Sequence, residues 1–465
     1  MSDITLVNSV FPSTSAMPPY GLLSLSAVLE EKGYTVDVRD YQLTDSEDPW
    51  EWSTFLPFLE GSADIIGISA YSFSLPFLMK AVTRLKEEHP EKTILLGGIG
   101  AAGVHEELMN QFPCVDILVR GEGERTLPRV LHALAQNDSL ERIKGITYRE
   151  KEKEKRRVRV NPPQERIENL DELPLPSFEK IDFSSYLVPA IMYSRGCPFP
   201  CTFCDLAPYW DRKNTRRSLS HFLDEITLLT ETYHQERITI VDDTFVLDKS
   251  RVLAFCEALR TEHIDIEWGC YGRVDLVDTE TLSAMARAGC KKIYYGIESG
   301  NDDILSAIKK GFTIHQALKA IDLSLQHIPV VQTAFVWGFP FESVHQLHDT
   351  LFAIMHLIRK GTAVKAALLT PFPLSSIYAQ YRDSIAFSES MISNLYMAGF
   401  HDKPEIIELI KQNKDLFCSF YYYDAPDIKE KYELVKTFGL SSEDIWDTWE
   451  RSKWDGHVDS QSNSP

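Results

Sequence analysis

Cysteine is scarce in this chain, with eight residues among 465. So sparse a set excludes the disulfide framework that stabilises small secreted proteins. Basic residues are also in the minority, since 48 Lys and Arg stand against 68 Asp and Glu and give a formal net charge of −20. Nucleic acid binding depends on clustered Lys and Arg that contact phosphates, so we expect no nucleic acid partner.

Targeting and membrane signals are lacking as well. The N-terminus has no basic segment and leads directly into the apolar run Ile4 to Val7, which is unlike a signal peptide, so we expect a cytoplasmic protein. One uncharged window, Leu323 to Phe341, has the length of a membrane span. Its internal Gln, His, Pro and Gly residues instead predict a helix end, a turn and a buried strand. No membrane span is expected.

The first part of the chain alternates short apolar runs with longer segments of helical periodicity. The apolar runs predict buried parallel strands at residues 4–7, 35–38, 64–69, 93–96 and 116–119. This order is typical of a doubly wound, Rossmann-like or flavodoxin-like open sheet, here assigned to a domain of residues 1–140. A segment with a hairpin and a proline-rich connector follows, at residues 141–185.

Loops rich in glycine, serine and acidic residues follow these predicted strands. Open parallel sheets bind ligands at the carboxyl ends of their strands, so a shared ligand is expected there. The candidate contacts are Pro19, Gly21, Ser69, Ser72, Gly97, Gly98, Gly121, Glu122 and Glu124. None of the loops matches the dinucleotide or Walker patterns, and ordinary tight turns are the alternative.

A second, longer alternation predicts another domain at residues 186–385. Its expected strands are residues 190–194, 238–241, 266–270, 292–297, 330–337 and 363–369. Six strand–helix units indicate a barrel or partial barrel whose active site lies at the carboxyl ends of the strands. Helix starts are predicted at Asp248 and at capping boxes formed by Thr313 with Gln316 and Ser343 with Gln346. A helical region, 386–455, and a flexible tail, 456–465, complete the chain.

Three of the eight cysteines, Cys197, Cys201 and Cys204, lie in one short loop after the first barrel strand. An iron-sulfur cube is usually held by four cysteine thiolates, and no fourth cysteine is nearby. An open coordination position is typical of a catalytic metal centre. The alternatives are a zinc site with a distant ligand and three unrelated buried thiols. The scattered Cys256, Cys270, Cys290 and Cys418 are expected to be buried apolar residues.

The Cys-x3-Cys-x2-Cys loop after the first strand of a partial (β/α)6 barrel resembles the radical S-adenosylmethionine superfamily. The resemblance implies a 4Fe-4S cluster on the three cysteines. It also implies that S-adenosylmethionine binds the open iron and is cleaved to a 5′-deoxyadenosyl radical. Four residues at strand ends match positions that contact S-adenosylmethionine in this superfamily, with the first of them near the adenine: Phe203, Asp242, Arg273 and Glu298.

The N-terminal loops resemble the cobalamin-binding domain of class B radical S-adenosylmethionine methyltransferases, and the resemblance runs from residue 1 to about residue 380. It implies cobalamin at the nine loop residues and an electron donor such as flavodoxin or ferredoxin. It further implies transfer of a methyl group from methylcobalamin to an unactivated carbon or phosphorus of a small molecule or peptide. The Asp-x-His-x-x-Gly motif of methionine-synthase-type proteins is absent, since His105 lacks that context; a domain without bound cobalamin is the alternative.

Other functions of this architecture are weighed against methyl transfer. An enzyme that cyclises, oxidises or rearranges its substrate without methyl transfer is the first alternative. A non-catalytic cobalamin or iron-sulfur sensor is the second, disfavoured because a sensor needs no open iron flanked by Arg273 and Glu298. The tRNA methylthiotransferases are excluded, because the N-terminal domain lacks their second cysteine cluster and the chain ends without a basic tail.

Overall fold

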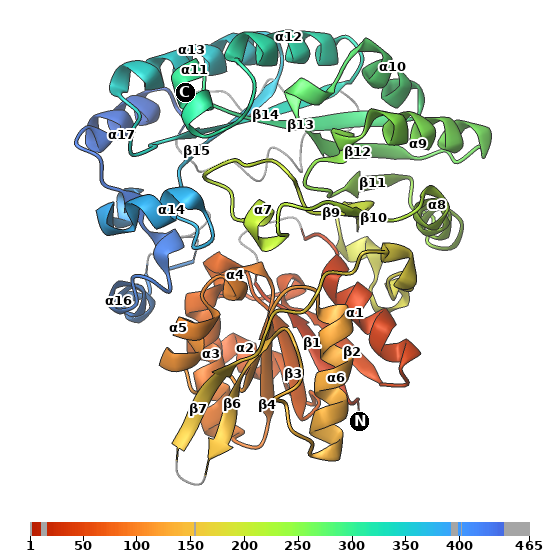
Figure 1. Cartoon of the computed structure of the whole chain (residues 1–465), viewed down its shortest axis with the longest axis vertical. Coiled ribbons are helices and arrows are strands. Elements are labelled where there is room, and N and C mark those ends of the chain that lie inside the picture. The colour runs from red at the N-terminus through yellow and green to blue at the C-terminus, as the bar shows by residue number, and fades with distance from the viewer. Residues whose placement is uncertain (1, 11–15, 153–154, 392–398, 401, 441–465) are drawn as a thin grey trace.

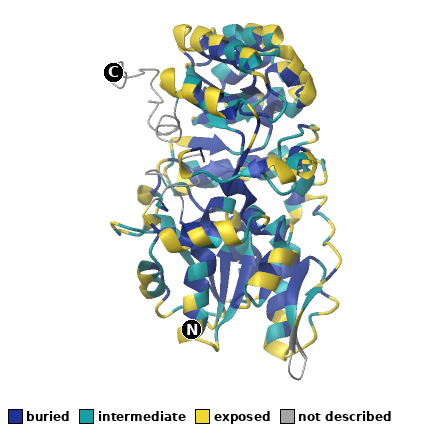
Figure 2. Cartoon of the chain, turned by 90° about the vertical axis from the view of Figure 1, so that its left-hand side faces the viewer, coloured by how far each residue is buried: buried dark blue, intermediate teal, exposed yellow. Residues whose placement is uncertain are grey.

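The computed structural model describes residues 2–440 except 11–15, 153–154, 392–398 and 401. Two α/β units are stacked on each other, with the N-terminal sheet below and the second sheet above it (Figure 1). Helices of the C-terminal region lie along one side of the stack and reach from the upper unit back to the lower one. Buried residues concentrate in the two sheets, while the outer faces of the surrounding helices are exposed (Figure 2).

The N-terminal unit contains a seven-stranded sheet in the order β2-β1-β3-β4-β5-β6-β7. Its first five strands are parallel and mostly apolar, as strands covered on both faces require. They are β1 (Ile4–Asn8), β2 (Val36–Asp40), β3 (Ile65–Ser69), β4 (Thr93–Gly97) and β5 (Ile117–Val119). The predicted doubly wound sheet is confirmed.

Helices cover both faces of this sheet. Two of them pack against each other on one face, α1 (Tyr20–Glu31) and α6 (Gly123–Gln136). Others lie on the opposite side of the unit in Figure 1: α2 (Trp52–Phe58), α3 (Leu75–Glu88), α4 (Ile99–Ala102) and α5 (His105–Gln111). The strands therefore lie between two helical layers, and their carboxyl ends face the upper unit.

The predicted hairpin extends the N-terminal sheet instead of standing apart from it. Strand β6 (Ile146–Glu152) pairs antiparallel with both β5 and β7 (Lys155–Val160), so the sheet continues beyond residue 140. The connector that follows contains only short 3-10 turns, at Leu170–Glu172, Phe178–Lys180 and Phe183–Ser185. It runs back along the N-terminal unit before entering the second sheet.

The second unit is a six-stranded parallel sheet in the order β15-β14-β13-β12-β11-β8. Its strands are β8 (Ala190–Ile191), β11 (Arg237–Ile240), β12 (Glu267–Gly272), β13 (Cys290–Glu298), β14 (Val330–Trp337) and β15 (Ala363–Leu368). The first and last strands do not pair with each other, so the barrel is open, which confirms the predicted partial barrel. The strand expected at residues 190–194 is divided, because β9 (Ser194–Arg195) leaves the sheet and pairs antiparallel with β10 (Thr215–Arg216).

The helices of the second unit begin where the sequence predicts. Asp248 accepts a hydrogen bond from the Arg251 amide and caps α9 (Lys249–Thr261). Capping boxes open α12 (Ile314–Leu325) and α13 (Val344–Arg359). The other helices of this unit are α7 (Leu206–Tyr209), α8 (Leu219–Thr227), α10 (Thr279–Arg287) and α11 (Asp302–Ala307).

The uncharged window from Leu323 to Phe341 contains the end of α12, a turn and β14, as expected. Among the described residues, no helix combines the length and the apolar character needed to cross a bilayer.

The C-terminal region mixes helices with a short strand pair. Its elements are α14 (Ser376–Tyr381), β16 (Ile385–Ala386), α16 (Pro404–Gln412), β17 (Tyr422–Tyr423) and α17 (Ile428–Thr437). Helix α17 packs on α13, whereas α16 packs on α3 of the N-terminal unit. A buried Lys403 Nζ lies 2.8 Å from Glu51 Oε1 and joins the C-terminal region to the N-terminal unit. The predicted tail lies outside the described residues.

Candidate functional site

A cavity of about 230 Å³ lies at the carboxyl edge of the N-terminal sheet. Seven of the nine loop residues predicted from the sequence line it: Gly21, Ser69, Gly97, Gly98, Gly121, Glu122 and Glu124. The other two do not line it, since Pro19 precedes α1 as its N-cap and Ser72 begins a 3-10 turn. The structure therefore brings most of the predicted loop residues to one concave surface.

Glycine is required where the loops after β3 and β4 meet. Gly98 has a φ of 93°, and a Cβ built on it would lie 2.6 Å from the Ala70 carbonyl oxygen. Only glycine adopts this conformation without strain. A Cβ on Gly100 would lie 2.3 Å from the Ser72 amide nitrogen. Because neither glycine carries a side chain, the two loops can lie this close together, and their backbone atoms form part of the cavity wall.

The opposite wall of the cavity comes from the barrel unit. Met192, Arg195, Tyr209 and Trp210 line it, and all four lie close to the cysteine loop in the sequence. The Tyr209 hydroxyl donates to the Gly121 carbonyl at 3.2 Å and so joins the two walls. None of these four residues was predicted from the sequence; their position beside the cysteines was the signal that could have indicated them.

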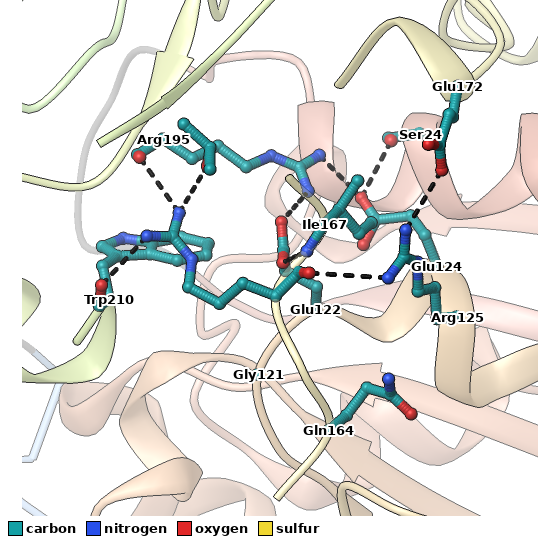
Figure 3. Close-up of polar contacts among 12 residues, drawn as sticks. Ser24, Gly121, Glu122, Glu124, Arg125, Gln164, Ile167, Glu172, Arg195 and Trp210 are labelled. Carbon is teal, nitrogen blue, oxygen red and sulfur yellow. Dashed lines mark hydrogen bonds and ion pairs between the residues drawn. The ribbon is translucent and has the colours of Figure 1, made fainter. Parts of the chain in front are cut away.

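An ion-pair cluster joins the two walls of the cavity (Figure 3). Arg195 Nη1 lies 2.9 Å from Glu122 Oε1, and Arg195 Nη2 lies 2.7 Å from Glu124 Oε1. Burial alone would raise the pKa of Glu124, but the adjacent guanidinium holds it below its ordinary value. Ser24 Oγ adds a hydrogen bond to Glu124 at 3.1 Å. Both carboxylates predicted from the sequence are therefore bound by protein partners.

The cysteine loop is shaped by the glycine that precedes it. Gly196 has a φ of 93°, and a Cβ there would lie 2.1 Å from the Lys213 carbonyl oxygen. Asn214 Nδ2 donates to the Gly196 carbonyl at 2.7 Å. The chain thus turns sharply just before Cys197.

The three cysteines of the loop are all free thiols. Cys197 Sγ lies 3.6 Å from Thr244 Oγ1, and Cys201 Sγ lies 3.9 Å from Arg273 Nη1. Burial raises the pKa of the Cys201 thiol and raises that of Cys204 to about 12. Binding of a metal cluster therefore has to displace protons from these two thiols.

The cysteine loop supplies three sulfur donors. Among the described residues, no three His, Cys, Asp or Glu side chains converge as ligands of a single metal ion. In an iron-sulfur cube each cysteine binds a different iron, so the sulfurs need not converge on one point. Three free thiols in one loop fit that group.

A buried ion pair follows β13. Glu298 Oε1 lies 3.2 Å from Lys310 Nζ, and both side chains are nearly inaccessible. A Cβ on Gly296 would lie 2.3 Å from Glu298 Oε1, so this glycine makes room for the carboxylate. The Lys310 ammonium also lies 6.0 Å from the ring centroid of Phe203, which is a predicted site residue. Lys310 itself was not predicted, because no local pattern pairs it with Glu298.

The remaining predicted contacts of S-adenosylmethionine are engaged by the protein itself. Arg273 makes two hydrogen bonds to Asp275, at 3.1 and 3.0 Å, and its guanidinium lies 3.6 Å from the centroid of Phe199. Asp242 accepts from the Tyr193 amide at 2.7 Å and from Ser194 Oγ at 2.6 Å. Burial raises the pKa of Asp242 to about 6.

Both units of the chain are similar to known proteins. Residues 10–131 match the B12 binding domain family, and residues 191–354 match the radical SAM superfamily. An uncharacterized methyltransferase of Pyrococcus horikoshii is 31% identical over 342 residues, which cover 72% of each chain. An anaerobic magnesium-protoporphyrin IX monomethyl ester cyclase of Synechocystis is 28% identical over 374 residues, covering 78% of this chain and 72% of the cyclase.

The fold is also similar to a solved structure. A radical S-adenosylmethionine methyltransferase of Kitasatospora setae, determined with cobalamin and a 4Fe-4S cluster bound, superposes with a TM-score of 0.67 at 20% identity. The similarity covers 83% of this chain and 80% of that one. The two domains and their order define a radical enzyme that combines two cofactor sites. The chain belongs to the cobalamin-binding radical S-adenosylmethionine family, whose cofactors are cobalamin, S-adenosylmethionine and a 4Fe-4S cluster.

Proposed function

We propose that this enzyme transfers a methyl group to an unactivated carbon or phosphorus of a small molecule or peptide. One observation carries the proposal: a single cavity is lined by the glycine-rich loops of the N-terminal unit and by residues flanking the cysteine loop of the barrel. A ligand in that cavity lies beside the loop that carries Cys197, Cys201 and Cys204. The names of the Pyrococcus horikoshii and Kitasatospora setae proteins, both methyltransferases, support the proposal.

The proposal assigns the predicted residues to three groups. The three cysteines of the loop hold the cluster and leave one iron open. Four residues at strand ends contact S-adenosylmethionine: Phe203, Asp242, Arg273 and Glu298. Seven loop residues that line the cavity contact cobalamin: Gly21, Ser69, Gly97, Gly98, Gly121, Glu122 and Glu124. Pro19 and Ser72 belong to the same loops but lie outside the lining, so they shape the loops without touching the cofactor. When bound, these cofactors supply reductive cleavage of S-adenosylmethionine and transfer of its methyl group.

The protein's own residues orient these groups and exclude water. Arg273 is buried over Phe199 and beside Cys201, so its charge faces the cluster loop instead of solvent. Trp210 and Tyr209 place aromatic surface between the cavity and the cysteine loop. Holding reacting groups in a fixed, dry arrangement lowers the barrier to a reaction between them. We further propose a flavodoxin-like or ferredoxin-like electron donor, because the cleavage consumes an electron. We also propose a cytoplasmic location.

A second candidate is a reaction of the same architecture without methyl transfer, such as cyclisation, oxidation or rearrangement. The similarity to a protein named as a magnesium-protoporphyrin IX monomethyl ester cyclase favours this alternative. Both candidates share the cofactors and the cavity. They differ in the fate of the methyl group of S-adenosylmethionine.

Labelled S-adenosylmethionine distinguishes the two candidates. Anaerobically purified enzyme, loaded with cluster and cobalamin and reduced, is incubated with S-adenosylmethionine that carries a deuterated methyl group and with a metabolite extract. Methyl transfer predicts S-adenosylhomocysteine, 5′-deoxyadenosine and a product that carries the label. Formation of 5′-deoxyadenosine with an unlabelled product supports the second candidate. Failure to cleave S-adenosylmethionine contradicts both.

A further inference from the structure

A cluster of buried charges joins the cobalamin cavity to the cysteine loop, and we call it the Arg195 clamp. It consists of Arg195, Glu122 and Glu124, together with Arg166 and the backbone of Ile167 (Figure 3). The side chains of the first three are 10%, 3% and 6% exposed. Salt screens such buried charges far less than it screens charges on the surface.

The lower half of the clamp, formed by the side chains of Arg195, Glu122 and Glu124, fixes the loop after β5. Arg195 contacts Glu122 and Glu124 with different guanidinium nitrogens. The second oxygen of Glu122 accepts from the Ile167 amide at 2.7 Å, so the connector also holds this loop. Gly121, Glu122 and Glu124 line the cavity. The position of one cavity wall therefore depends on a side chain from the barrel unit.

The upper half of the clamp fixes the chain just before the cysteines. Arg166 Nη2 donates to the Arg195 carbonyl at 3.1 Å and to Thr215 Oγ1 at 2.6 Å. Its Nη1 donates to the carbonyls of Trp210 and Lys213, at 3.0 and 2.9 Å. The Arg166 guanidinium also lies 5.0 Å from the centroid of the Trp210 ring. The backbone two residues before Cys197 is thus bound from the connector.

We infer that Arg195 is a positioning residue that sets the separation between the cobalamin site and the cluster site. Its side chain holds a wall of the first site, and its backbone leads into the loop of the second. An arginine fork bound to two carboxylates fixes direction as well as distance, which a single point charge does not. Other arrangements of the Arg195 side chain are unfavourable, because moving the guanidinium away would leave two buried carboxylates without a positively charged partner and away from water. The inference depends on the proposed function only in requiring both cofactors in one molecule.

The separation can be measured without turnover. In the holoenzyme, cob(II)alamin and the reduced cluster each carry an unpaired electron, and their dipolar coupling falls with the cube of the distance. Pulsed electron paramagnetic resonance therefore reports the distribution of distances between the two sites. The test variant combines Arg195→Met with Glu122→Gln and Glu124→Gln, which removes the clamp and leaves no buried charge unpaired. Glutamine keeps a hydrogen-bonding side chain at both loop positions, so we expect this variant still to bind both cofactors and to show a distance distribution widened by about twofold.

A nearby control uses an exposed ion pair between α6 and the connector. Arg125 Nη2 lies 3.1 Å from Glu172 Oε2, with the side chains 35% and 55% exposed. Arg125→Met is expected to leave the distance distribution unchanged, because exposed pairs contribute little. Arg195→Lys, which keeps one positive charge but not the fork, is expected to widen the distribution and serves if the triple variant does not fold.

The outcomes separate this inference from the proposed function. A wild-type distance distribution in the triple variant, or in Arg195→Lys where the triple variant does not fold, overturns the inference and leaves methyl transfer intact. Loss of corrinoid from Arg195→Lys with normal cluster content supports the inference, because both carboxylates are retained and the cavity wall has then moved. Loss of the cluster alone overturns it, since Arg195 would then serve only the cysteine loop. A wild-type enzyme without corrinoid contradicts both.

Discussion

The two cofactor regions of this enzyme are built in opposite ways. The cavity of the N-terminal unit is open and lined largely by glycine and apolar residues, and most of the residues predicted from the sequence line it. In the barrel, the charged residues predicted to contact S-adenosylmethionine are occupied by protein partners: Asp242, Arg273 and Glu298. A glycine-lined wall stays open because its shape is fixed by the backbone. Buried charges must find partners, so they bind one another.

This difference has a consequence for binding. A ligand of the open cavity displaces solvent and leaves the hydrogen bonds of the loops in place. A ligand of the barrel site has to exchange protein partners for its own charged groups, and only the difference in free energy contributes to its affinity. We therefore expect substitutions in the barrel to change stability strongly. Substitutions in the cavity should change cobalamin content at a smaller cost in stability.

Cys201→Ala should have the largest effect and should separate the two regions completely. The variant loses a proposed ligand of the cluster, so we expect loss of the iron-sulfur absorption and of S-adenosylmethionine cleavage. Cobalamin content should be retained, because Cys201 does not line the cavity. Iron, sulfide and corrinoid analysis of anaerobic protein measures all three. Cys256→Ala, at another buried cysteine, is the control; a brown, active Cys201→Ala enzyme would contradict the assignment.

Lys310→Met tests whether the barrel site is stabilised by its own ion pair. The substitution leaves Glu298 buried without its partner, which costs about 3–5 kcal/mol of unfolding free energy. Adding Glu298→Gln should recover much of that loss, because the stranded charge is then removed. Denaturant unfolding of the apoprotein measures both. Lys249→Met, which breaks an exposed pair with Asp278, should cost less than about 1 kcal/mol; equal losses at the two lysines would refute the comparison.

Gly98→Ala tests the backbone-lined cavity. The new Cβ meets the Ala70 carbonyl oxygen in a conformation that only glycine adopts readily, with an expected strain of about 1–3 kcal/mol. The displaced loop should also lower cobalamin content, measured by its visible absorption. Gly61→Ala is the control. Gly61 also has a positive φ, of 70°, but no atom lies close to the position of an added Cβ. Normal cobalamin content in Gly98→Ala would show that this loop does not shape the cavity.

The features predictable from the sequence are those encoded locally. The Cys-x3-Cys-x2-Cys spacing, the glycine loops and the capping boxes each lie within a few residues. The residues that form each of these features are therefore neighbours in the sequence, where a pattern can reveal them. The five apolar strands of the N-terminal sheet were predictable for the same reason, because strands buried on both faces are continuously apolar. Their ends differ from the predicted ranges by one or two residues.

The features that escaped prediction depend on contacts between distant segments. Arg195 meets Glu122 and Lys310 meets Glu298 only after the sheets have formed, and nothing in either local sequence marks the pair. The division of the first barrel strand into β8 and β9 was not predicted either, because the contact at this point comes from a residue far along the sequence. Asp242, on another strand end, binds the backbone of Tyr193 where the chain leaves the sheet.

Glu342→Gln should have the smallest effect of these substitutions. It changes a carboxylate of the barrel unit in which only one of the two oxygens has a hydrogen-bond partner. Glu342 Oε2 accepts from the Gly338 amide at 2.8 Å, whereas its buried Oε1 has no hydrogen-bond partner. Burial raises the pKa of Glu342 from 4.5 to about 7. Because the folded state binds the proton more tightly than the unfolded state, this group stabilises the fold at low pH and loses that contribution as pH rises toward 7.

The pH dependence gives the prediction its sign and size. Between pH 5.5 and 6.5, wild-type protein should lose about 1 kcal/mol of unfolding free energy relative to Glu342→Gln. Denaturant unfolding of both proteins at the two pH values measures this difference, and other titrating groups cancel in the comparison. Glu389→Gln, at an exposed carboxylate, is the control substitution. If the wild type instead gains stability over Glu342→Gln as pH rises, the nearby Lys431 ammonium, which donates to the Glu342 carbonyl, controls this carboxylate more strongly than burial does.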